Sequence, residues 1–303
     1  MTEPLVSVIL PTHNRAPLLE RAMRSVLDQS YRALELIVID DASTDDTAEV
    51  VRASGDSRVR YLRQPERRGV SAARNRGMSE AQGELIAFQD SDDEWLPDKL
   101  RQQVDRLAAL PTDVALTQAA VRYEGTVTRY CFSALPAGQE STAILPCNNS
   151  SYLQACLART ACLREVGGLD ERLSLWEDWE LMIRVCQRYR VDMDPRVMTV
   201  IHDTPGSLAK QHQRRVETLR MIMDKHAALM QAAPKALAAN LYAIARFQSL
   251  DGRADEARAT LARSLRLDPA RPRSWALLGF SLLPTSLIRR IVAWRDATRR
   301  SAG

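Results

Sequence analysis

Acidic side chains crowd the ends of two short apolar runs. Asp40 and Asp41 follow the run 34–39, and Asp90 and Asp92 follow the run 85–88. Paired carboxylates suit Mg²⁺ or Mn²⁺, which are hard cations that prefer oxygen ligands. Such an ion usually shares its coordination with substrate phosphates. These residues therefore predict a site for a divalent cation and a phosphate-bearing ligand.

A simpler explanation exists for the first acidic stretch, VIDDASTDDT at 38–47. It could be only a turn and a helix cap, which would account for Ser43 and Asp45. A turn does not explain why acidic clusters follow two different apolar runs. We therefore favour a ligand site.

The elements that must position these residues alternate between two kinds. Apolar runs at 6–10, 34–39, 59–62 and 85–88 predict strands, and amphipathic stretches at 18–28, 44–52 and 70–81 predict helices. Pro17 lies near the start of the first helix, and Ser43 or Thr44 could cap the second. Alternation of this kind predicts an α/β fold with a mostly parallel sheet, in which ligands bind at the carboxyl ends of the strands.

A basic segment supplies candidate partners for phosphate. The dinucleotide fingerprint GxGxxG and a Walker loop are both absent after the first strand. GVSAARNRG at 69–77 instead places Arg74 and Arg76 on a helix whose N-terminus could face an anion. A basic helix alone is usually a solvated face, but beside a carboxylate cation site it could clamp a diphosphate.

Five segments in order carry a resemblance to a known family. They are PTHNR (11–15), VIDDASTDDT (38–47), GVSAARNRG (69–77), FQDSDDEWLPDKL (88–100) and GGLDERLSLWEDWEL (167–181). Together they resemble a family 2 glycosyltransferase over roughly the first two-thirds of the chain. The resemblance implies the GT-A fold, which is Rossmann-like with helices flanking a mostly parallel central sheet.

The resemblance also implies an activity and a set of ligands. It implies inverting transfer from a nucleotide-diphosphate sugar, with UDP as the expected nucleotide, to a hydroxyl acceptor in cell-surface polysaccharide or glycoconjugate synthesis. Mn²⁺ or Mg²⁺ would be bound by Asp92, with Asp90 and His202 as further candidates. The implied nucleotide-binding residues, among which Thr12 and Asp41 would contact the nucleoside, are Pro11, Thr12, Asn14, Arg15, Asp41, Gly69, Arg74, Asp90 and Ser91.

The segment WEDWEL matches the part of the family motif that carries the general base. Asp178 takes that role by resemblance, and Trp176, Glu177 and Trp179 are expected to contact the acceptor or the sugar, because indoles suit the apolar faces of a sugar. Glu177 and Asp178 could instead be first-turn acids that complement a helix dipole, and Trp179 could be a core residue. Acceptor-recognition loops are expected at 116–146, which matches the family poorly, and around 167–175.

Charge divides the chain. Residues 1–209 carry a net charge of −7 and residues 210–303 one of +11, so we place a domain boundary near residue 210. The second region is predicted to be all-α, with a tetratricopeptide-like helix pair over 238–283 and a basic amphipathic tail over 286–303. The pair could pack as a cap, form a homodimer surface or dock a partner. The tail could lie on an anionic membrane or dock on the protein, and no nucleic-acid motif accompanies its charge.

Location and competing functions follow from what the sequence lacks. The apolar run at 6–10 has no basic region ahead of it, so we expect a cytoplasmic protein, with peripheral contact at the inner face of the membrane as an option. A sugar-nucleotide pyrophosphorylase would need a glycine-rich loop where PTHNR stands. A catalytically inactive scaffold is the alternative of a different class, and Asp41, Asp90, Asp92 and Asp178 argue against it.

Overall fold

The computed structural model describes residues 3–124, 129–131, 145, 151–202 and 212–282. The chain forms two compact units, Met1–Pro205 and Gly206–Gly303, which we describe separately. The boundary drawn from the charge pattern was 209/210. None of the helices in the described ranges carries an apolar stretch long enough to cross a lipid bilayer.

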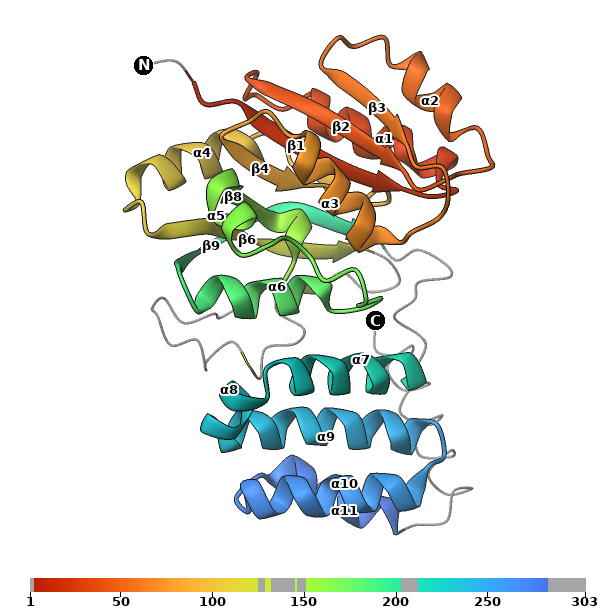
Figure 1. The fold of residues 1–303 in the computed structure, drawn as a ribbon, viewed down its shortest axis with the longest axis vertical. Helices are drawn as coiled ribbons and strands as arrows, with labels where there is room; N and C mark the ends of the chain where they lie inside the picture. The colour runs from red at the N-terminus through yellow and green to blue at the C-terminus, as the bar shows by residue number, and fades with distance from the viewer. Residues whose placement is uncertain (1–2, 125–128, 132–144, 146–150, 203–211, 283–303) are drawn as a thin grey trace. The chain divides into compact units, whose positions relative to one another are not determined.

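The first unit is built on a nine-stranded sheet in the order β3-β2-β1-β4-β8-β6-β9-β5, with β7 paired to β6 (Figure 1). The first four strands in the chain are parallel neighbours: β1 (Val6–Thr12), β2 (Leu34–Asp40), β3 (Val59–Arg63) and β4 (Leu85–Phe88). All four were predicted from their apolar runs. The register sets Thr12 beside Asp40, so the two strands end together at one edge.

The other half of the sheet is mixed. Its strands are β5 (Glu94–Trp95), β6 (Val114–Glu124), β7 (Arg129–Cys131), β8 (Cys156–Arg159) and β9 (Arg190–His202). Because β8 runs antiparallel to both β4 and β6, and β9 is parallel to β6, the strands β6 and β9 end at the same edge as β4. The prediction of a loop from 116 onward is wrong as far as residue 124, because that stretch lies inside β6 and is largely buried.

Helices cover both faces of the sheet. Helices α1 (Ala16–Leu27), α2 (Thr47–Ala53) and α4 (Lys99–Ala109) share one core cluster with Val8 and Leu10 of β1, and α3 (Val70–Glu80) packs on the opposite face. There α3 approaches β1 closely, since a Cβ on Gly77 would lie 2.4 Å from Cγ2 of Ile9. Gly77 therefore fixes how near α3 comes to the sheet.

The start of α2 differs from the prediction. The helix begins at Thr47, so neither Ser43 nor Thr44 caps it. The carboxylate of Asp45 instead accepts hydrogen bonds from the hydroxyl of Thr47 at 2.5 Å and from the backbone N–H of Ala16 at 3.0 Å. Burial opposes these bonds, but they hold the pKa of Asp45 below its usual value. Asp45 thus ties the starts of α1 and α2 together.

The second unit is all-α over its described residues, as predicted. Its helices are α7 (His212–Lys225), α8 (Ala227–Ala232), α9 (Pro234–Leu250), α10 (Ala254–Leu267) and α11 (Pro272–Ser281). Ala245, Ala257 and Leu261 form a small core between α9 and α10. The tetratricopeptide-like character of this pair stays a prediction, and the tail 286–303 lies outside the described residues.

One lysine is buried in the first unit. Lys99 begins α4 with its side chain fully buried, and its Nζ lies 4.0 Å from the ring centroid of Trp95. The ammonium donates a hydrogen bond to Oε1 of Gln103 at 2.7 Å. Burial lowers the pKa of Lys99 from 10.5 to about 7, because a desolvated ammonium is costly. Lys99 and Trp95 thereby anchor the segment that follows the acidic end of β4.

Replacing Lys99 with Met should change how stability depends on pH. Between pH 7 and 10.5 the unfolded chain binds a proton that folded Lys99 has lost, so wild-type stability should gain with rising pH. Lys99→Met should lack that gain. Its free energy of unfolding minus that of wild type should therefore be larger at pH 6 than at pH 9. Urea denaturation at both pH values measures this. Lys235→Met, at an exposed position, serves as the control, and parallel behaviour of the two variants would contradict the assignment.

Candidate active site

The predicted residues at the ends of β1 and β2 are brought together. The backbone N–H of Asp41 donates to the carbonyl of Thr12 at 2.8 Å. Thr12 is buried, and its hydroxyl has no hydrogen-bond partner among the described residues. A buried hydroxyl without a partner is costly, so it marks a point where a ligand group could bind.

Asp41 organises the loop that leads into α3. One carboxylate oxygen accepts hydrogen bonds from the side chain of Gln64 and the backbone N–H of Arg68, both at 2.7 Å, and the other accepts from the N–H of Gly69 at 2.8 Å. Two carboxylate oxygens offer about four acceptor sites, so one further bond, such as one from a nucleobase, remains available. Nucleoside binding by Asp41 stays a prediction.

The PTHNR segment links three loops at the sheet edge. Asn14 donates its backbone N–H to Oγ of Ser43 at 2.9 Å and accepts a hydrogen bond from the N–H of Thr44 at 2.8 Å. Arg15 donates to Oδ2 of Asp92 at 2.6 Å. Pro11 pairs with Ile39 inside the sheet. Asn14 and Arg15 thus join the end of β1 to the acidic segments after β2 and β4.

Arg74 lies at the centre of the site. It is 5% exposed, and its two terminal nitrogens each lie 2.6 Å from a carboxylate oxygen, one of Asp90 and one of Glu177. Burial alone would lower the pKa of Arg74, but these two carboxylates raise it overall. Binding of a diphosphate by Arg74 stays a prediction, and its guanidinium joins the end of β4 to α6 (Glu177–Cys186).

Two carboxyl groups of the acidic segment after β4, those of Asp90 and Asp93, have raised pKa values. Burial raises the pKa of Asp90 although Arg74 opposes it, and the charges of Asp92 and Glu177 add to the rise. Burial raises the pKa of Asp93 well above its usual value, with further contributions from Asp90 and Asp92. Binding of a cation would offset the charges that these acids place on one another and would favour their ionised forms.

Asp178 lies in the first turn of α6, next to Glu177. Burial and the charge of Glu177 raise its pKa to about 8, although the backbone N–H of Trp179 and the charge of Arg74 act in the opposite direction. A carboxylate with its pKa near neutrality is suited to taking up a proton during a reaction. A mere helix-dipole acid would be expected to ionise more readily, so the pKa favours the general-base interpretation.

The two tryptophans beside Asp178 differ in position. Trp179 is fully buried, which favours the alternative of a core residue over contact with a sugar. Trp176 is partly exposed and adopts a left-handed conformation, with φ 56° and ψ 24°, as it precedes the helix. This conformation is unfavourable for a bulky residue and persists only where its surroundings impose it.

The residues fit a divalent cation through their chemistry. Asp92 and Asp90 offer carboxylate oxygens at the strand end, and Ser91 between them is buried. Over the described residues no three His, Cys, Asp or Glu side chains converge on one point. A Mg²⁺-type site needs only one or two protein carboxylates, which act together with substrate phosphates rather than as a closed cage.

Asp93 is a residue for which no role was predicted. Its carboxylate accepts hydrogen bonds from the backbone N–H of His202 at 3.1 Å and from the side chain of Gln154 at 3.2 Å. It thereby brings the end of β9, with His202, to the acidic segment. Nε2 of His202 lies 3.5 Å from a carboxylate oxygen of Glu94, and metal binding by His202 stays a prediction. The sequence feature that could have indicated this role is the third carboxylate of DSDD, which is Asp93.

Comparison with known proteins gives the following likenesses. The model of the family described as Glycosyl transferase family 2 matches residues 7–159. A putative teichuronic acid biosynthesis glycosyltransferase, TuaG of Bacillus subtilis, is 42% identical over 34% of this chain and 42% of its own. The succinoglycan biosynthesis protein ExoO of Rhizobium meliloti is 30% identical over 68% of this chain and 63% of its own.

The name of a third relative states its substrates. The UDP-Glc:alpha-D-GlcNAc-diphosphoundecaprenol beta-1,3-glucosyltransferase WfgD of Escherichia coli is 39% identical over 35% of this chain and 42% of its own. The matches thus span less than two-thirds of the length of these three curated relatives.

Solved structures share the fold. Residues 1–349 of Staphylococcus aureus TarS in complex with UDP-GlcNAc superpose with a TM-score of 0.67 at 18% identity, covering 90% of this chain and 84% of that one. The mannosyltransferase PcManGT of Pyrobaculum calidifontis, with GDP-Man and Mn²⁺, gives 0.60 at 22% identity over 95% and 87%. The expected fold, with its helical C-terminal region, is confirmed.

The left-handed backbone at Trp176 gives a test of strain. Relief of that conformation is worth roughly 1–2 kcal/mol to a residue without a Cβ, which exceeds the roughly 0.5–1 kcal/mol that glycine usually costs relative to alanine. Trp176→Gly should therefore be at least as stable as Trp176→Ala in thermal unfolding. The same pair at exposed Asp105 in α4 should show the usual order, alanine above glycine. Alanine above glycine at both positions would disprove the strain.

Proposed function

The chain belongs to glycosyl transferase family 2, and we propose that it is an inverting, metal-dependent glycosyltransferase that uses a nucleotide-diphosphate sugar. One observation carries the proposal. Arg74 binds both Asp90, in the acidic segment after β4, and Glu177, the neighbour of Asp178. This bridge gathers a donor-side carboxylate pair and a raised-pKa carboxylate into one site, as a displacement at a sugar carbon requires.

On the donor side, residues at the ends of β1 and β2 would hold the nucleotide. Among the described residues the hydroxyl of Thr12 has no hydrogen-bond partner and Asp41 keeps acceptor capacity, so both are available to the nucleoside. UDP is the proposed nucleotide, since WfgD is named for UDP-Glc and TarS was solved with UDP-GlcNAc. Asp92, with Asp90 beside it, would hold a divalent cation that offsets the charge of the departing diphosphate. Mn²⁺ is the first candidate, because PcManGT was solved with it.

On the acceptor side, Asp178 would act as the general base. As the acceptor oxygen forms its bond to the anomeric carbon, the hydroxyl proton moves to the Asp178 carboxylate. The bond from that carbon to the diphosphate oxygen breaks, and the nucleoside diphosphate leaves with the electron pair. Attack from the face opposite the leaving group inverts the anomeric configuration. Glu177, held by Arg74, would keep the first turn of α6 in place.

The proposed acceptor is a glycan on a lipid diphosphate carrier. WfgD is named for such a substrate, and TuaG and ExoO are named for teichuronic acid and succinoglycan biosynthesis. We therefore place the reaction in the synthesis of a cell-surface polysaccharide or glycoconjugate. An acceptor of this kind would bring the enzyme to a membrane surface as a peripheral protein, acting from the cytoplasmic side.

The proposal is tested by assaying the protein against a panel. UDP-Glc, UDP-GlcNAc, UDP-Gal and GDP-Man are incubated with and without Mn²⁺, in the presence of water alone or of alkyl-diphosphate-linked α-GlcNAc. We expect Mn²⁺-dependent release of a nucleoside diphosphate and a thermal shift with the preferred donor. A protein that binds these donors but releases no diphosphate would be an inactive scaffold.

Asp178 separates chemistry from binding. Asp178→Asn keeps the shape but cannot accept a proton, so turnover should fall by roughly 10²–10⁴-fold while affinity for UDP and Mn²⁺ changes little. The wild-type rate should rise with pH toward about 8, the pKa of the base, and the residual rate of the variant should lose that dependence. Initial rates and calorimetry measure both.

The matched control for this variant is Asp113→Asn. Asp113 is exposed and precedes β6, at the sheet edge opposite the site, so its substitution should alter neither property. Near-normal turnover in Asp178→Asn would place the base elsewhere. A loss of UDP binding as severe as the loss of turnover would place Asp178 in the nucleotide pocket.

Asp92 tests the cation. Asp92→Ala should weaken Mn²⁺-dependent UDP binding by about 100-fold or more, since even residues outside the metal's direct ligands typically contribute 10–100-fold. The fold should persist, because Asp92 lies partly exposed at a strand end. Calorimetric titration of UDP with and without Mn²⁺ measures the effect, with Asp113→Ala as the control. An unchanged metal-linked affinity would remove Asp92 from the cation site.

A further inference from the structure

We propose that Glu180, Arg184 and Asn75 are positioning residues that hold the 166–176 segment in place for the acceptor. This inference rests on the proposed glycosyl transfer. The 166–176 segment joins α5 (Thr160–Glu165) to α6 and ends directly before Glu177 and Asp178. The position of this segment therefore determines where Asp178, the proposed base, lies relative to a bound acceptor.

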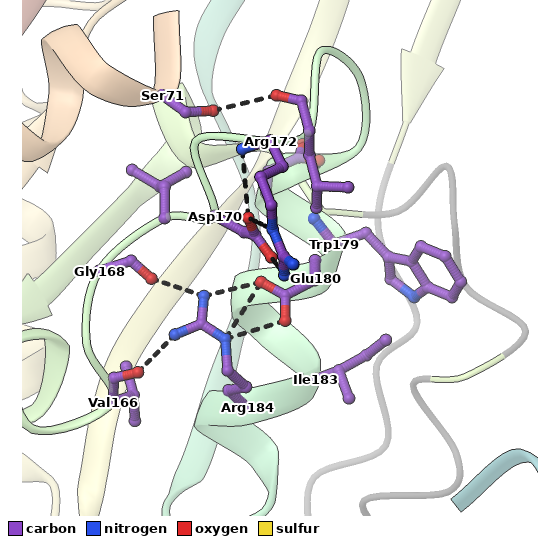
Figure 2. Close-up of polar contacts among 12 residues, drawn as sticks. Ser71, Val166, Gly168, Asp170, Arg172, Trp179, Glu180, Ile183 and Arg184 are labelled. Atoms are coloured by element: carbon purple, nitrogen blue, oxygen red, sulfur yellow. Dashed lines mark hydrogen bonds and ion pairs between the residues drawn. The ribbon is translucent and has the colours of Figure 1, made fainter. Parts of the chain in front are cut away.

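The first attachment comes from α6. Glu180 is fully buried, and Nε of Arg184 lies 2.9 Å from its Oε1 while Nη2 lies 2.8 Å from its Oε2. The paired contact fixes the plane of the guanidinium. Its outward donors then meet two backbone carbonyls of the segment, that of Val166 and, at 2.5 Å, that of Gly168 (Figure 2).

The second attachment comes from α3. The side-chain amide of Asn75 accepts a hydrogen bond from the N–H of Leu169 at 2.8 Å and donates one to its carbonyl at 2.9 Å. Gly168 makes this approach possible, because it adopts φ +68° and a Cβ there would lie 2.7 Å from Oδ1 of Asn75. Further along, Oγ of Ser71 donates to the carbonyl of Leu173 at 3.4 Å.

The two attachments act on helices that also carry the site. Helix α3 holds Arg74 and helix α6 holds Glu177 and Asp178, so the segment is fastened at both sides to the elements joined by the Arg74 bridge. Trp176, at its end, is kept in a left-handed conformation that needs such support. Loosening the segment should therefore disturb the acceptor side and spare the donor side.

A purely stabilising role is the alternative. Burying a carboxylate and a guanidinium costs free energy, and an apolar pair of similar volume often gives equal or greater stability. What an apolar pair cannot supply is a donor aimed at the carbonyls of Val166 and Gly168. Substituting the whole pair should therefore separate positioning from stability.

The experiment uses three forms of the protein besides wild type. Glu180→Leu combined with Arg184→Met removes the buried pair without leaving a lone charge. Asn75→Ala removes the second attachment and involves no buried charge, so it remains informative should the double variant fold poorly. Arg188→Met is the control. Arg188 makes an exposed ion pair with Glu165 at 3.1 Å, and this ion pair does not involve the 166–176 segment.

Three measurements are made on each form. Calorimetry gives the affinity for UDP with Mn²⁺, hydrogen exchange reports the amides of 166–176, and initial rates give KM for the alkyl-diphosphate-linked α-GlcNAc acceptor with the preferred donor. In the double variant and in Asn75→Ala, we expect faster exchange at Leu169 and an acceptor KM raised about 10- to 100-fold, with UDP affinity within about twofold of wild type. Arg188→Met should match wild type throughout.

Unchanged exchange and unchanged acceptor KM in both variants would overturn the inference, as would a loss confined to UDP affinity. Failure of the proposed function is distinguishable. If wild type turns over no donor in the panel, glycosyl transfer itself is refuted and the acceptor role falls with it. The exchange data would then report only whether the attachments fix the segment.

Discussion

The burial of one guanidinium between two carboxylates holds the first unit's site together. Arg74 is nearly inaccessible to solvent, and its two terminal nitrogens reach Asp90 on one side and Glu177 on the other. Removing it would leave two acids facing each other in a region of low dielectric, at a cost of several kcal/mol for each uncompensated charge. Arg74 thereby joins the end of β4 to the start of α6, which lie far apart in the sequence.

The same arrangement leaves the site short of positive charge. Arg74 pairs with Asp90 and Glu177, and Arg15 pairs with Asp92, while burial and the neighbouring acids raise the pKa values of Asp90, Asp93 and Asp178. Such a cluster lowers the stability of the folded chain at neutral pH, since protons or cations must be taken up to relieve it. Unfavourable electrostatics of this kind are typical of functional sites, where the same charges that lower stability shift the pKa values of reactive groups. Lys99, buried behind the acidic segment with its pKa lowered to about 7, adds little charge to offset it.

Short sequence patterns predicted the parts of the site that depend on residues close together in the chain. The four parallel strands and the meeting of Thr12, Asp41 and Asp90 at one edge followed from apolar runs and their polar ends. Residues 116–124 of β6 were predicted to be a loop because they match the family poorly, although the first eight residues of the strand are buried. The partners of Arg74, the role of Asp93 and the left-handed Trp176 depend on contacts between distant segments. The basic segment at 69–77 marked Arg74 as a candidate phosphate ligand, but could not show that carboxylates from two other elements would enclose it.

Gly77 is one turn of α3 away from Arg74. Its missing side chain lets α3 settle against Ile9 of β1. The depth at which α3 lies determines how far Arg74 reaches beneath the strand ends, so the reach of the guanidinium is set by a hydrophobic contact and not by charge. A larger residue at 77 would lift the helix and separate Arg74 from Asp90 without changing any polar group. Packing in the core of this protein thus determines the geometry of its site, and a packing defect at this contact would lower activity.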